Sequence, residues 1–296
     1  KHRLGIHYEA VAKVNPRIVY GSIAGFGQDA PYGKRPGVDQ IAQGMGGLMS
    51  ITGLPGQGPV RVGIPICDLT SGIFLAQGIL MALLDREVTG KGQWVHTSLL
   101  ESIMQMLDFQ ATRWTMAGEV APQAGNNHPT GIPTGVFPTA DGHINIAASG
   151  NNLWVRFCEA IGQDALPDHP DYATGDARSA NRDALNALLS ETTRQKPSQE
   201  WIDLLNEAGV PCGPIYSIDQ VFADPQVKHL QMTRPVTHPQ LGELQLLGQA
   251  LNLTATPEPE RIRRPTPELG EQTDEILGEL GYDTSAIAAL RERGEV

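Results

Sequence analysis

Asp68 has the surroundings in this sequence that most suggest chemistry. It follows the run VGIPIC and opens DLTSGIFLAQGIL, whose apolar spacing predicts a helix. A carboxylate in the first turn of a helix lies near backbone N–H groups without intrahelical partners and near the positive end of the helix dipole. Such an aspartate can act as a covalent nucleophile. Aspartate is also a favoured N-cap, and the spacing alone favours the N-cap role for Asp68.

The segments around Asp68 alternate between helix and strand. The apolar residues that follow it, up to residue 84, form a wide stripe typical of a largely buried helix. A turn at TGKGQ then leads into a strand and another helix. This order implies an α/β fold with a mainly parallel sheet. Before Asp68 we predict a helix at 8–14, a strand at 18–23, a Gly- and Pro-rich loop at 24–40 and a helix at 40–52.

The second half of the chain has a different character. Residues 136–149 predict a hairpin with Ala140, Asp141 and Gly142 in its turn. Helices are expected at 152–161, 181–192 and 198–208, then one ending near the Asp224–Pro225 step and a closing helix at 271–280, with a solvated charged tail. The predicted organisation is the first part of a large domain at 1–117, a linker and loop at 118–134, a small α+β domain at 135–232, and a return segment at 233–296 that completes the large domain.

Composition narrows the class of protein. The chain has 296 residues, of which 40% are hydrophobic and 19% charged, as in globular proteins. Its net charge of -11 argues against nucleic-acid and anionic-membrane partners. Cys67, Cys158 and Cys212 lack disulfide or metal-ligand spacing, so we expect no metal and a reducing cytoplasm. The longest apolar stretch, residues 72–84, is too short for a membrane span. Because the chain begins at Lys1 almost directly with a helix, we expect a missing N-terminal portion.

Four segments carry a family resemblance. They are NPRIVYGSIAGFGQDAPY, RPGVDQIAQGMGGLMSITG, GIPICDLTSGIFLAQGILMALLDREVTGKGQWVHTSLL and AGVPCGPIYSIDQVFADPQV. Together they resemble the class III CoA-transferase family, which includes the formyl-CoA and carnitine-type CoA-transferases. The resemblance implies a Rossmann-like large domain lacking its first part here, a smaller α+β domain, and an interlocked homodimer whose site lies between domains of different subunits.

The resemblance also implies a role for Asp68. The matching aspartate in the family attacks an acyl-CoA thioester to give a mixed anhydride and CoA thiolate. Return of the thiolate gives an aspartyl-CoA thioester, which the acceptor carboxylate opens. The implied partners are an acyl-CoA and a small carboxylic acid, with CoA thioester as substrate and no permanently bound cofactor. The pattern is nearer to carnitine-type and dicarboxylate-using members than to formyl or oxalyl enzymes, which suggests a succinyl-CoA or similar donor.

Other site residues follow from the same resemblance. Arg3 matches a family position that contacts the nucleotide end of CoA, and Lys34 and Arg35 are weaker candidates for its phosphates. Segment 124–135 matches the place of a mobile active-site loop, to which Gly131 and Gly135 would give mobility. Glycine-rich backbone is a source of N–H donors for an oxyanion, but this segment departs from relatives with a glycine run or a glutamine here, so no donor is assigned. A plain linker explains its composition equally well.

Alternative functions stay open. An α-methylacyl-CoA racemase shares much of this pattern but has a histidine where this sequence has Val38, and valine cannot transfer a proton. A hydrolase would need an activated serine or cysteine, but the chain lacks a Gly-x-Ser-x-Gly elbow, and Cys67 is typical of a small buried hydrophobe. TGKGQ lacks the full P-loop pattern, which argues against ATP binding. A non-catalytic acyl-CoA-binding fragment is the remaining alternative.

Overall fold

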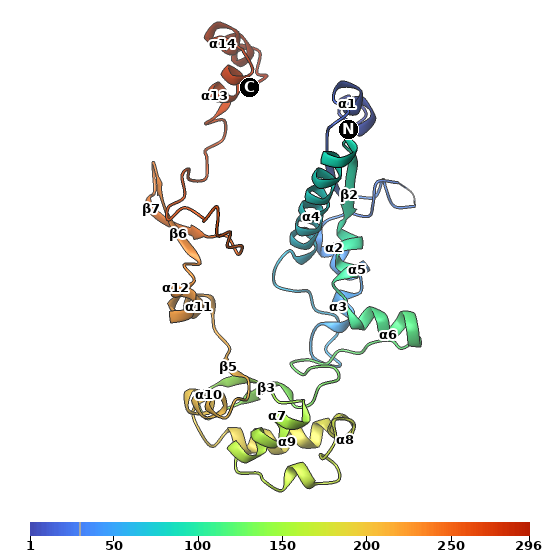
Figure 1. Ribbon diagram of the computed structural model, residues 1–296, viewed down its shortest axis with the longest axis vertical. Coiled ribbons are helices and arrows are strands. Elements are labelled where there is room, and N and C mark those ends of the chain that lie inside the picture. Colours follow the sequence, from blue (N-terminus) through green and yellow to red (C-terminus); the bar gives the residue numbers. More distant parts are fainter. Residues whose placement is uncertain (30) are drawn as a thin grey trace. The chain divides into compact units, whose positions relative to one another are not determined.

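The computed structural model describes residues 1–29 and 31–296 (Figure 1). Ala30, inside the loop predicted for 24–40, lies outside the described residues. The chain divides into two compact units, Lys1–Pro214 and Ile215–Val296. The boundary that the sequence suggested after residue 232 therefore falls inside the second unit.

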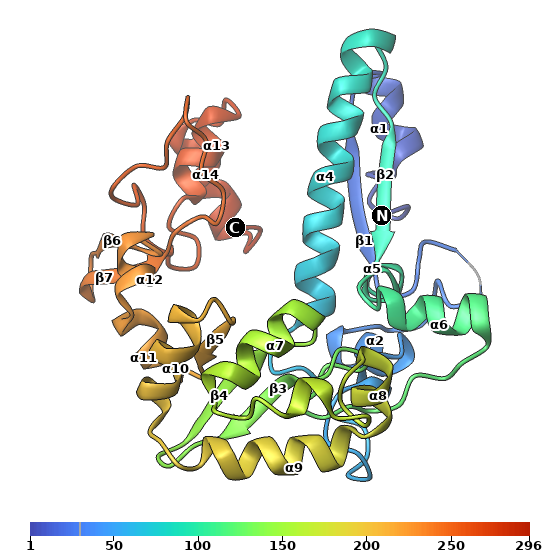
Figure 2. The ribbon, with the colours of Figure 1, turned by 60° about the horizontal axis from the view of Figure 1, so that its bottom comes forward.

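The first unit begins with a strand–helix–strand arrangement. Strands β1 and β2 pair in parallel, with Tyr20 opposite Trp94, and helix α4 packs beside both strands (Figure 2). Gly21 and Gly78 let this helix approach closely, because a Cβ on either would lie within 3 Å of a facing side-chain carbon. The expected parallel pairing is confirmed for these two strands. The elements are α1 (Tyr8–Val14), β1 (Tyr20–Ala24), α2 (Asp39–Met45), α3 (Leu48–Ile51), α4 (Ile66–Thr89), β2 (Trp94–Ser98), α5 (Leu99–Gln105) and α6 (Phe109–Ala117).

The helix predicted at 40–52 is two helices. Gly47 has a φ of 86°, in the left-handed region, and it separates α2 from α3. Gly46 packs against Ile103, since a Cβ there would lie 2.2 Å from a side-chain carbon of that residue. The two adjacent glycines therefore break the helix and bring it against α5.

Helix α4 corrects two expectations. The sequence predicted a largely buried helix, but only Cys67, Thr70, Ser71 and Ala82 of its 24 residues are buried. A row on one face is exposed, and its large members include Leu69, Ile73, Leu80, Met81, Leu84 and Val88. The helix also extends beyond the stretch 72–84, so that by length and composition alone it could cross a membrane. Its packing against β1, β2 and α5 is that of a crossover helix in a globular fold.

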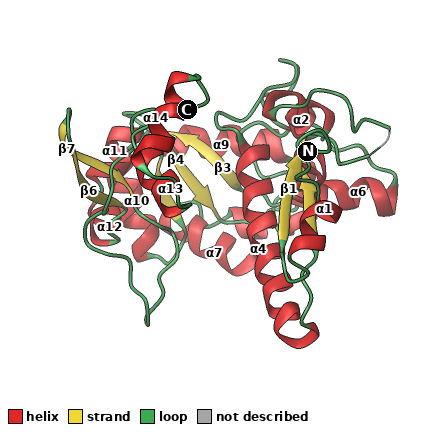
Figure 3. Ribbon diagram, turned by 90° about the horizontal axis from the view of Figure 1, so that it is seen from above, coloured by secondary structure: helices red, strands yellow, loops and turns green. Residues whose placement is uncertain are grey.

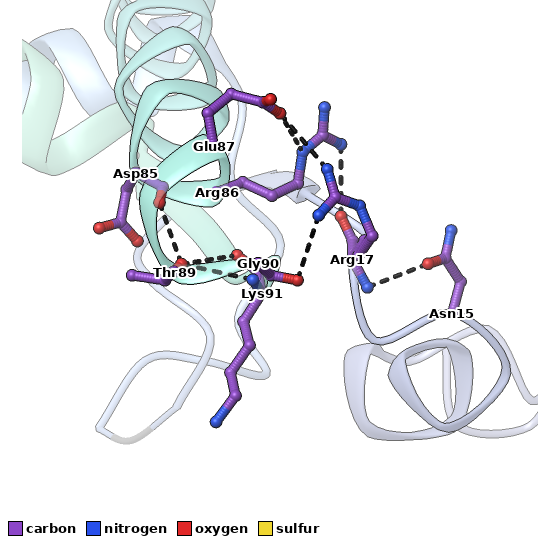
Figure 4. A network of polar contacts seen from close by, with 8 residues as sticks. All are labelled: Asn15, Arg17, Asp85, Arg86, Glu87, Thr89, Gly90 and Lys91. Carbon is purple, nitrogen blue, oxygen red and sulfur yellow. Dashed lines mark hydrogen bonds and ion pairs between the residues drawn. The ribbon is translucent and has the colours of Figure 1, made fainter.

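The C-terminal end of α4 carries a polar network with the segment that precedes β1 (Figure 4). Arg17 pairs with Glu87 at 3.3 Å and donates to the Gly90 carbonyl, while Arg86 donates to the Arg17 carbonyl. Cations at this end complement the helix dipole. Gly90 is a left-handed C-cap at φ 73°, so TGKGQ presents helix carbonyls rather than a phosphate-binding row of N–H groups. The predicted turn between a helix and a strand is confirmed at this segment.

The rest of the first unit is built around a small antiparallel sheet of order β3–β4–β5 (Figure 2), of which Figure 3 labels β3 and β4. The predicted hairpin is confirmed, with Val136 opposite Asn145. Helices α7, α9 and α10 lie within one or two residues of their predicted bounds. Residues of the sheet and helices form one apolar core that includes Phe137, Trp154 and Leu189. The elements are β3 (Thr134–Pro138), β4 (His143–Ala147), α7 (Asn151–Ala160), the 3-10 helix η1 (Leu166–Asp168), α8 (Gly175–Ala180), α9 (Arg182–Thr193), α10 (Ser198–Glu207) and β5 (Cys212–Pro214).

The second unit contains elements that the sequence did not predict. They include the antiparallel hairpin β6–β7 and α14, which occupies the tail expected to be solvated. The helix expected to end near Asp224 does so, and the Asp224 side chain then caps a further short helix through the N–H groups of Gln226 and Val227. The elements are α11 (Ile218–Ala223), α12 (Pro225–His229), β6 (Thr233–His238), β7 (Gly242–Leu247), α13 (Thr273–Glu279) and α14 (Thr284–Glu292).

Candidate active site

Asp68 is the third residue of α4 and its side chain is exposed. The N-cap of this helix is Pro65, so the interpretation of Asp68 as the cap of its own helix is wrong. Within residues 1–29 and 31–296, the Asp68 carboxylate takes part in no hydrogen bond or ion pair. The carboxylate is therefore both accessible and unoccupied by protein donors, as a nucleophile requires.

The cap of α4 comes from another helix. Asp39, the first residue of α2, is 8% exposed, and its Oδ1 accepts a hydrogen bond of 2.9 Å from the Cys67 N–H. Its Oδ2 accepts from Gln43 Nε2 at 2.8 Å. Arg61 lies 3.5 Å from the same oxygen. The sequence analysis missed Asp39, because no local spacing connects residues 28 positions apart.

Gln43 extends this contact to the segment before Asp68. It is fully buried, its Oε1 accepts from the Val62 N–H at 2.9 Å, and its Nε2 also donates to the Ile64 carbonyl at 3.3 Å. A buried amide that satisfies both its donor and its acceptor in this way fixes the backbone it contacts. The path of the chain into α4 is thus held by two side chains of α2.

Cys67 is buried, as the sequence suggested. Burial, the charge of Asp39 and the charge of Asp68 raise the pKa of its thiol from 9.0 to about 12. A thiol with so high a pKa is a poor nucleophile near neutral pH. Val38, the other residue weighed for an alternative chemistry, is the N-cap of α2 and is 61% exposed. Neither residue provides the proton transfer or the thiolate that a racemase or a cysteine hydrolase would need.

The loop at 124–135 is held by side chains of helices α8 and α9. Arg178 and Ser179 of α8 donate to the carbonyls of Ile132 and Thr130. Arg182 and Asn186 of α9 donate to the Pro129 carbonyl and to Asn127 Oδ1. Inside the loop, His128 Nδ1 accepts from the N–H groups of Thr130 and Gly131, at 3.2 and 2.8 Å. The bonds from α8 and α9 therefore tie the loop to these two helices, and the bonds to His128 hold it together internally.

Gly131 and Gly135 both lie close to neighbouring atoms. The mobility that we expected from them stays a prediction. A Cβ on Gly131 would lie 3.1 Å from Ser149 Oγ, and one on Gly135 would lie 2.7 Å from the Asn126 carbonyl oxygen. Gly135 and His128 line a cavity of about 800 Å³ between the loop and the strands of the small sheet.

The three basic candidates are all exposed and lie in two segments. The structure places Arg3 in a turn before α1, and Lys34 and Arg35 in the loop before α2. In the described part of the chain, no hydrogen bond or ion pair involves the side chain of any of the three. The Arg35 guanidinium lies 4.5 Å from the centre of the Tyr32 ring, which orients it as a cation–π pair. No contact joins these cations to Asp68 within the described residues.

Comparison with known proteins decides the family. The chain matches CoA-transferase family III over residues 1–273. It belongs to that family. It is 34% identical over 294 residues to the human succinyl-CoA:glutarate CoA-transferase, covering 99% of this chain and 67% of that protein. It is also 34% identical over 271 residues to the acetyl-CoA:oxalate CoA-transferase of Acetobacter aceti, covering 91% of this chain and 68% of the relative.

Solved structures agree with this family III assignment. A crystal structure of a CAIB/BAIF family protein from Brucella suis is similar with a TM-score of 0.79 and 33% identity, covering 94% of this chain and 72% of that one. The mixed α/β fold with small sheets is thus shared with a relative of known structure. The 296-residue chain spans about two thirds of the length of its curated relatives, since it covers 67% of the human protein and 68% of the Acetobacter aceti protein.

Proposed function

We propose that this family III member transfers CoA from an acyl-CoA to a free carboxylic acid, with Asp68 as the nucleophile. One observation carries the proposal: the Asp68 carboxylate stands exposed in the first turn of α4 while Asp39 occupies the neighbouring N–H group. An aspartate held by its own helix would have to break hydrogen bonds before attacking. Asp68 is free of them within the described residues.

The proposed reaction proceeds by four attacks and needs no net proton transfer. A carboxylate oxygen of Asp68 attacks the thioester carbon, the C–S bond breaks, and an acyl–aspartyl anhydride and CoA thiolate form. The thiolate then attacks the aspartyl carbonyl carbon and expels the donor acid as its carboxylate, leaving an aspartyl-CoA thioester. The acceptor carboxylate attacks this thioester and releases the thiolate. The thiolate finally attacks the acyl carbon of the new anhydride, which yields the new acyl-CoA and restores Asp68.

Recognition of CoA and of the tetrahedral intermediates falls to the remaining candidates. Arg3 would contact the nucleotide end of CoA, and Lys34 and Arg35 would meet its phosphates, since all three are exposed cations without another polar partner in the described chain. The loop with Gly131 and Gly135 would lie over the acyl group as a fixed wall. The cavity of about 800 Å³ beside this loop is not lined by Asp68, so this role rests on the family resemblance.

The acid substrate is proposed to be a dicarboxylate. Relatives that share about a third of their residues with this chain are named for glutarate and for oxalate. Succinyl-CoA is the proposed donor, since the human relative is named for it. The formyl-CoA and carnitine-type enzymes, through which the family was recognised, have no further support among these names.

The active unit is proposed to be a homodimer with a Rossmann-like large domain. The exposed apolar row of α4 supports it, because contiguous apolar surface on a globular protein usually marks an interface. A cytoplasmic location and the absence of nucleic-acid and membrane partners remain part of the proposal. The net charge of -11 and three free cysteines support them.

An acyl-exchange assay tests the proposed function. The full-length protein is incubated with succinyl-CoA and glutarate, and glutaryl-CoA is measured by mass spectrometry. Hydroxylamine added during turnover should leave a hydroxamate on Asp68 alone. Release of free CoA and succinate without an acceptor would instead indicate a hydrolase, and binding without any exchange would indicate a non-catalytic acyl-CoA binder.

A further inference from the structure

We propose that Asp39 and Gln43 form a clamp that positions Asp68 for attack. Both residues are on α2, one turn apart, and both are buried, at 8% and 0% exposure. The inference deepens the proposed function and rests on it, because a positioning role has meaning only if Asp68 reacts. Asp39 and Gln43 touch no reacting atom in the proposal, and they act through the backbone that carries the nucleophile.

The clamp holds the segment before Asp68 at three points. Gln43 accepts from the Val62 N–H at 2.9 Å and donates to the Ile64 carbonyl at 3.3 Å. Asp39 accepts from the Cys67 N–H at 2.9 Å, next to the nucleophile itself. The two side chains are joined by the 2.8 Å bond from Gln43 Nε2 to Asp39 Oδ2. A shift of the α4 N-terminus would therefore break several buried hydrogen bonds together.

Two features of the clamp leave the Asp68 carboxylate free. An acidic residue at the third position of a helix normally reaches back to the N–H of the N-cap residue. Here the N-cap is Pro65, which has no N–H to offer. The N–H of the second position, on Cys67, is already taken by Asp39. Both of these nearby backbone partners are thus removed, one by proline and one by a carboxylate from α2.

Variants at Asp39 test the clamp. Asp39→Ala removes the acceptor for Cys67, and we expect kcat to fall by about 10- to 100-fold, because a small misplacement of a reacting group costs that much. The KM for succinyl-CoA should change by less than about twofold. Asp39→Asn retains an oxygen that can accept from Cys67 and should recover most of kcat. Gln43→Ala should lower kcat as well, whereas Gln40→Ala, exposed on the same helix, should leave it unchanged.

The readouts separate positioning from general stability. Thermal unfolding is recorded for each variant, and the rate of hydroxamate formation on Asp68 reports the attack directly. A folded Asp39→Ala protein with wild-type kcat overturns the clamp, and so does an Asp39→Asn protein as slow as Asp39→Ala. If Asp39→Ala does not fold, Asp39→Asn and Gln43→Ala decide: near-full kcat in the first with a loss in the second supports the clamp, and any other pair of results rejects it.

A parallel Asp68→Asn variant keeps the two proposals apart. Full activity in Asp68→Asn removes the proposed function, whatever the Asp39 variants do. An inactive Asp68→Asn together with an unchanged Asp39→Ala removes only the clamp.

Discussion

Two regions of the first unit stabilise themselves by different means. The α4 region, residues 18–105, has an apolar core cluster of four buried residues, Ala42, Cys67, Leu99 and Ile103. The small-sheet region, residues 132–214, has 16 such residues in one cluster. Much of the inside of the α4 region is polar, with Asp39, Gln43, Thr70, Ser71, Ser98 and Ser102 all buried.

The difference indicates that the α4 region fixes the geometry around Asp68, whereas the small-sheet region supplies most of the folding stability. Directional hydrogen bonds fix a geometry, which suits the backbone around Asp68, while apolar burial supplies most of the free energy of folding. We therefore expect substitutions in the α4 region to affect activity and those in the small-sheet region to affect stability. The following experiments test that division, from the largest expected effect to the smallest.

Asp68→Asn should abolish transfer without loss of stability. An amide is a far weaker nucleophile than a carboxylate, and we expect kcat to fall by at least about 10³-fold. The side chain is exposed and free of protein hydrogen bonds in the described residues, so the melting temperature should not fall. Asp85→Asn, exposed near the other end of α4, is the matched control and should keep full activity. A stable, active Asp68→Asn protein would contradict the expectation that the α4 region determines activity.

Arg178→Met should have the largest effect on stability. The guanidinium is fully buried and donates to the carbonyls of Ile132, Ser149 and Tyr172 at 2.7 to 3.0 Å, and to Asn151 Oδ1 at 3.1 Å. Methionine fills much of the space but leaves these acceptors unsatisfied. We expect a loss of about 3 to 5 kcal/mol in the free energy of unfolding, measured by urea titration.

Arg156→Met serves as the control for Arg178, because Arg156 is exposed and makes one long hydrogen bond to a backbone carbonyl. It should change stability by less than about 0.5 kcal/mol. Equal effects of the two substitutions would mean that the buried position of Arg178 has no energetic weight.

Leu189→Ala and Leu84→Ala compare the two regions with the same change. Leu189 is fully buried in the small-sheet core, and its truncation should cost about 2 to 5 kcal/mol at any protein concentration. Leu84 is 72% exposed on α4, and its truncation should cost less than about 0.5 kcal/mol in the monomer. If α4 lies in a dimer interface, the effect of Leu84→Ala should grow with protein concentration, as light scattering and unfolding curves would show.

Alkaline pH should produce the smallest effect. Burial raises the pKa of the Cys158 thiol from 9.0 to about 12. Well below pH 9 the thiol is protonated in both native and unfolded chains. As the pH rises from 9 towards 12, the unfolded chain loses the proton first, so stability falls. The decrease in the urea midpoint between pH 8 and pH 10 should be smaller in Cys158→Ala than in the wild type, and an equal decrease would argue against this burial.

The small-sheet region was largely predictable because its signals are local. Alternation in His143–Ala147 and the turn residues before it indicate the hairpin, and the apolar period of α9 indicates its buried face. The break between α2 and α3 depends on the positive φ of Gly47. Glycine permits this conformation, but its presence in the sequence does not predict that the conformation is adopted. The hairpin β6–β7 was missed because Pro235 lies inside its first strand, and proline usually argues against a strand.

The site was predictable only in part, because its supporting contacts are not local. Asp68 was found through the resemblance and its place at a helix start. The clamp residue Asp39 acts across 28 positions, and a polar residue at the start of α2 gives no sign of which helix it caps. The burial of α4 was predicted wrongly for a related reason: an apolar row on a helix favours burial but does not identify what the row packs against.

The hydrogen bonds that hold the loop at 127–132 determine how this loop can move. Bonds from α8 and α9 reach four residues of the loop, so the loop cannot open without disturbing helices that belong to the main core. The amide hydrogens of Thr130 and Gly131, bonded to His128 Nδ1, should then exchange with deuterium at rates close to those of the α9 amides. Any opening of this segment would therefore have to carry α8 and α9 with it, which local fraying of a flexible lid does not require.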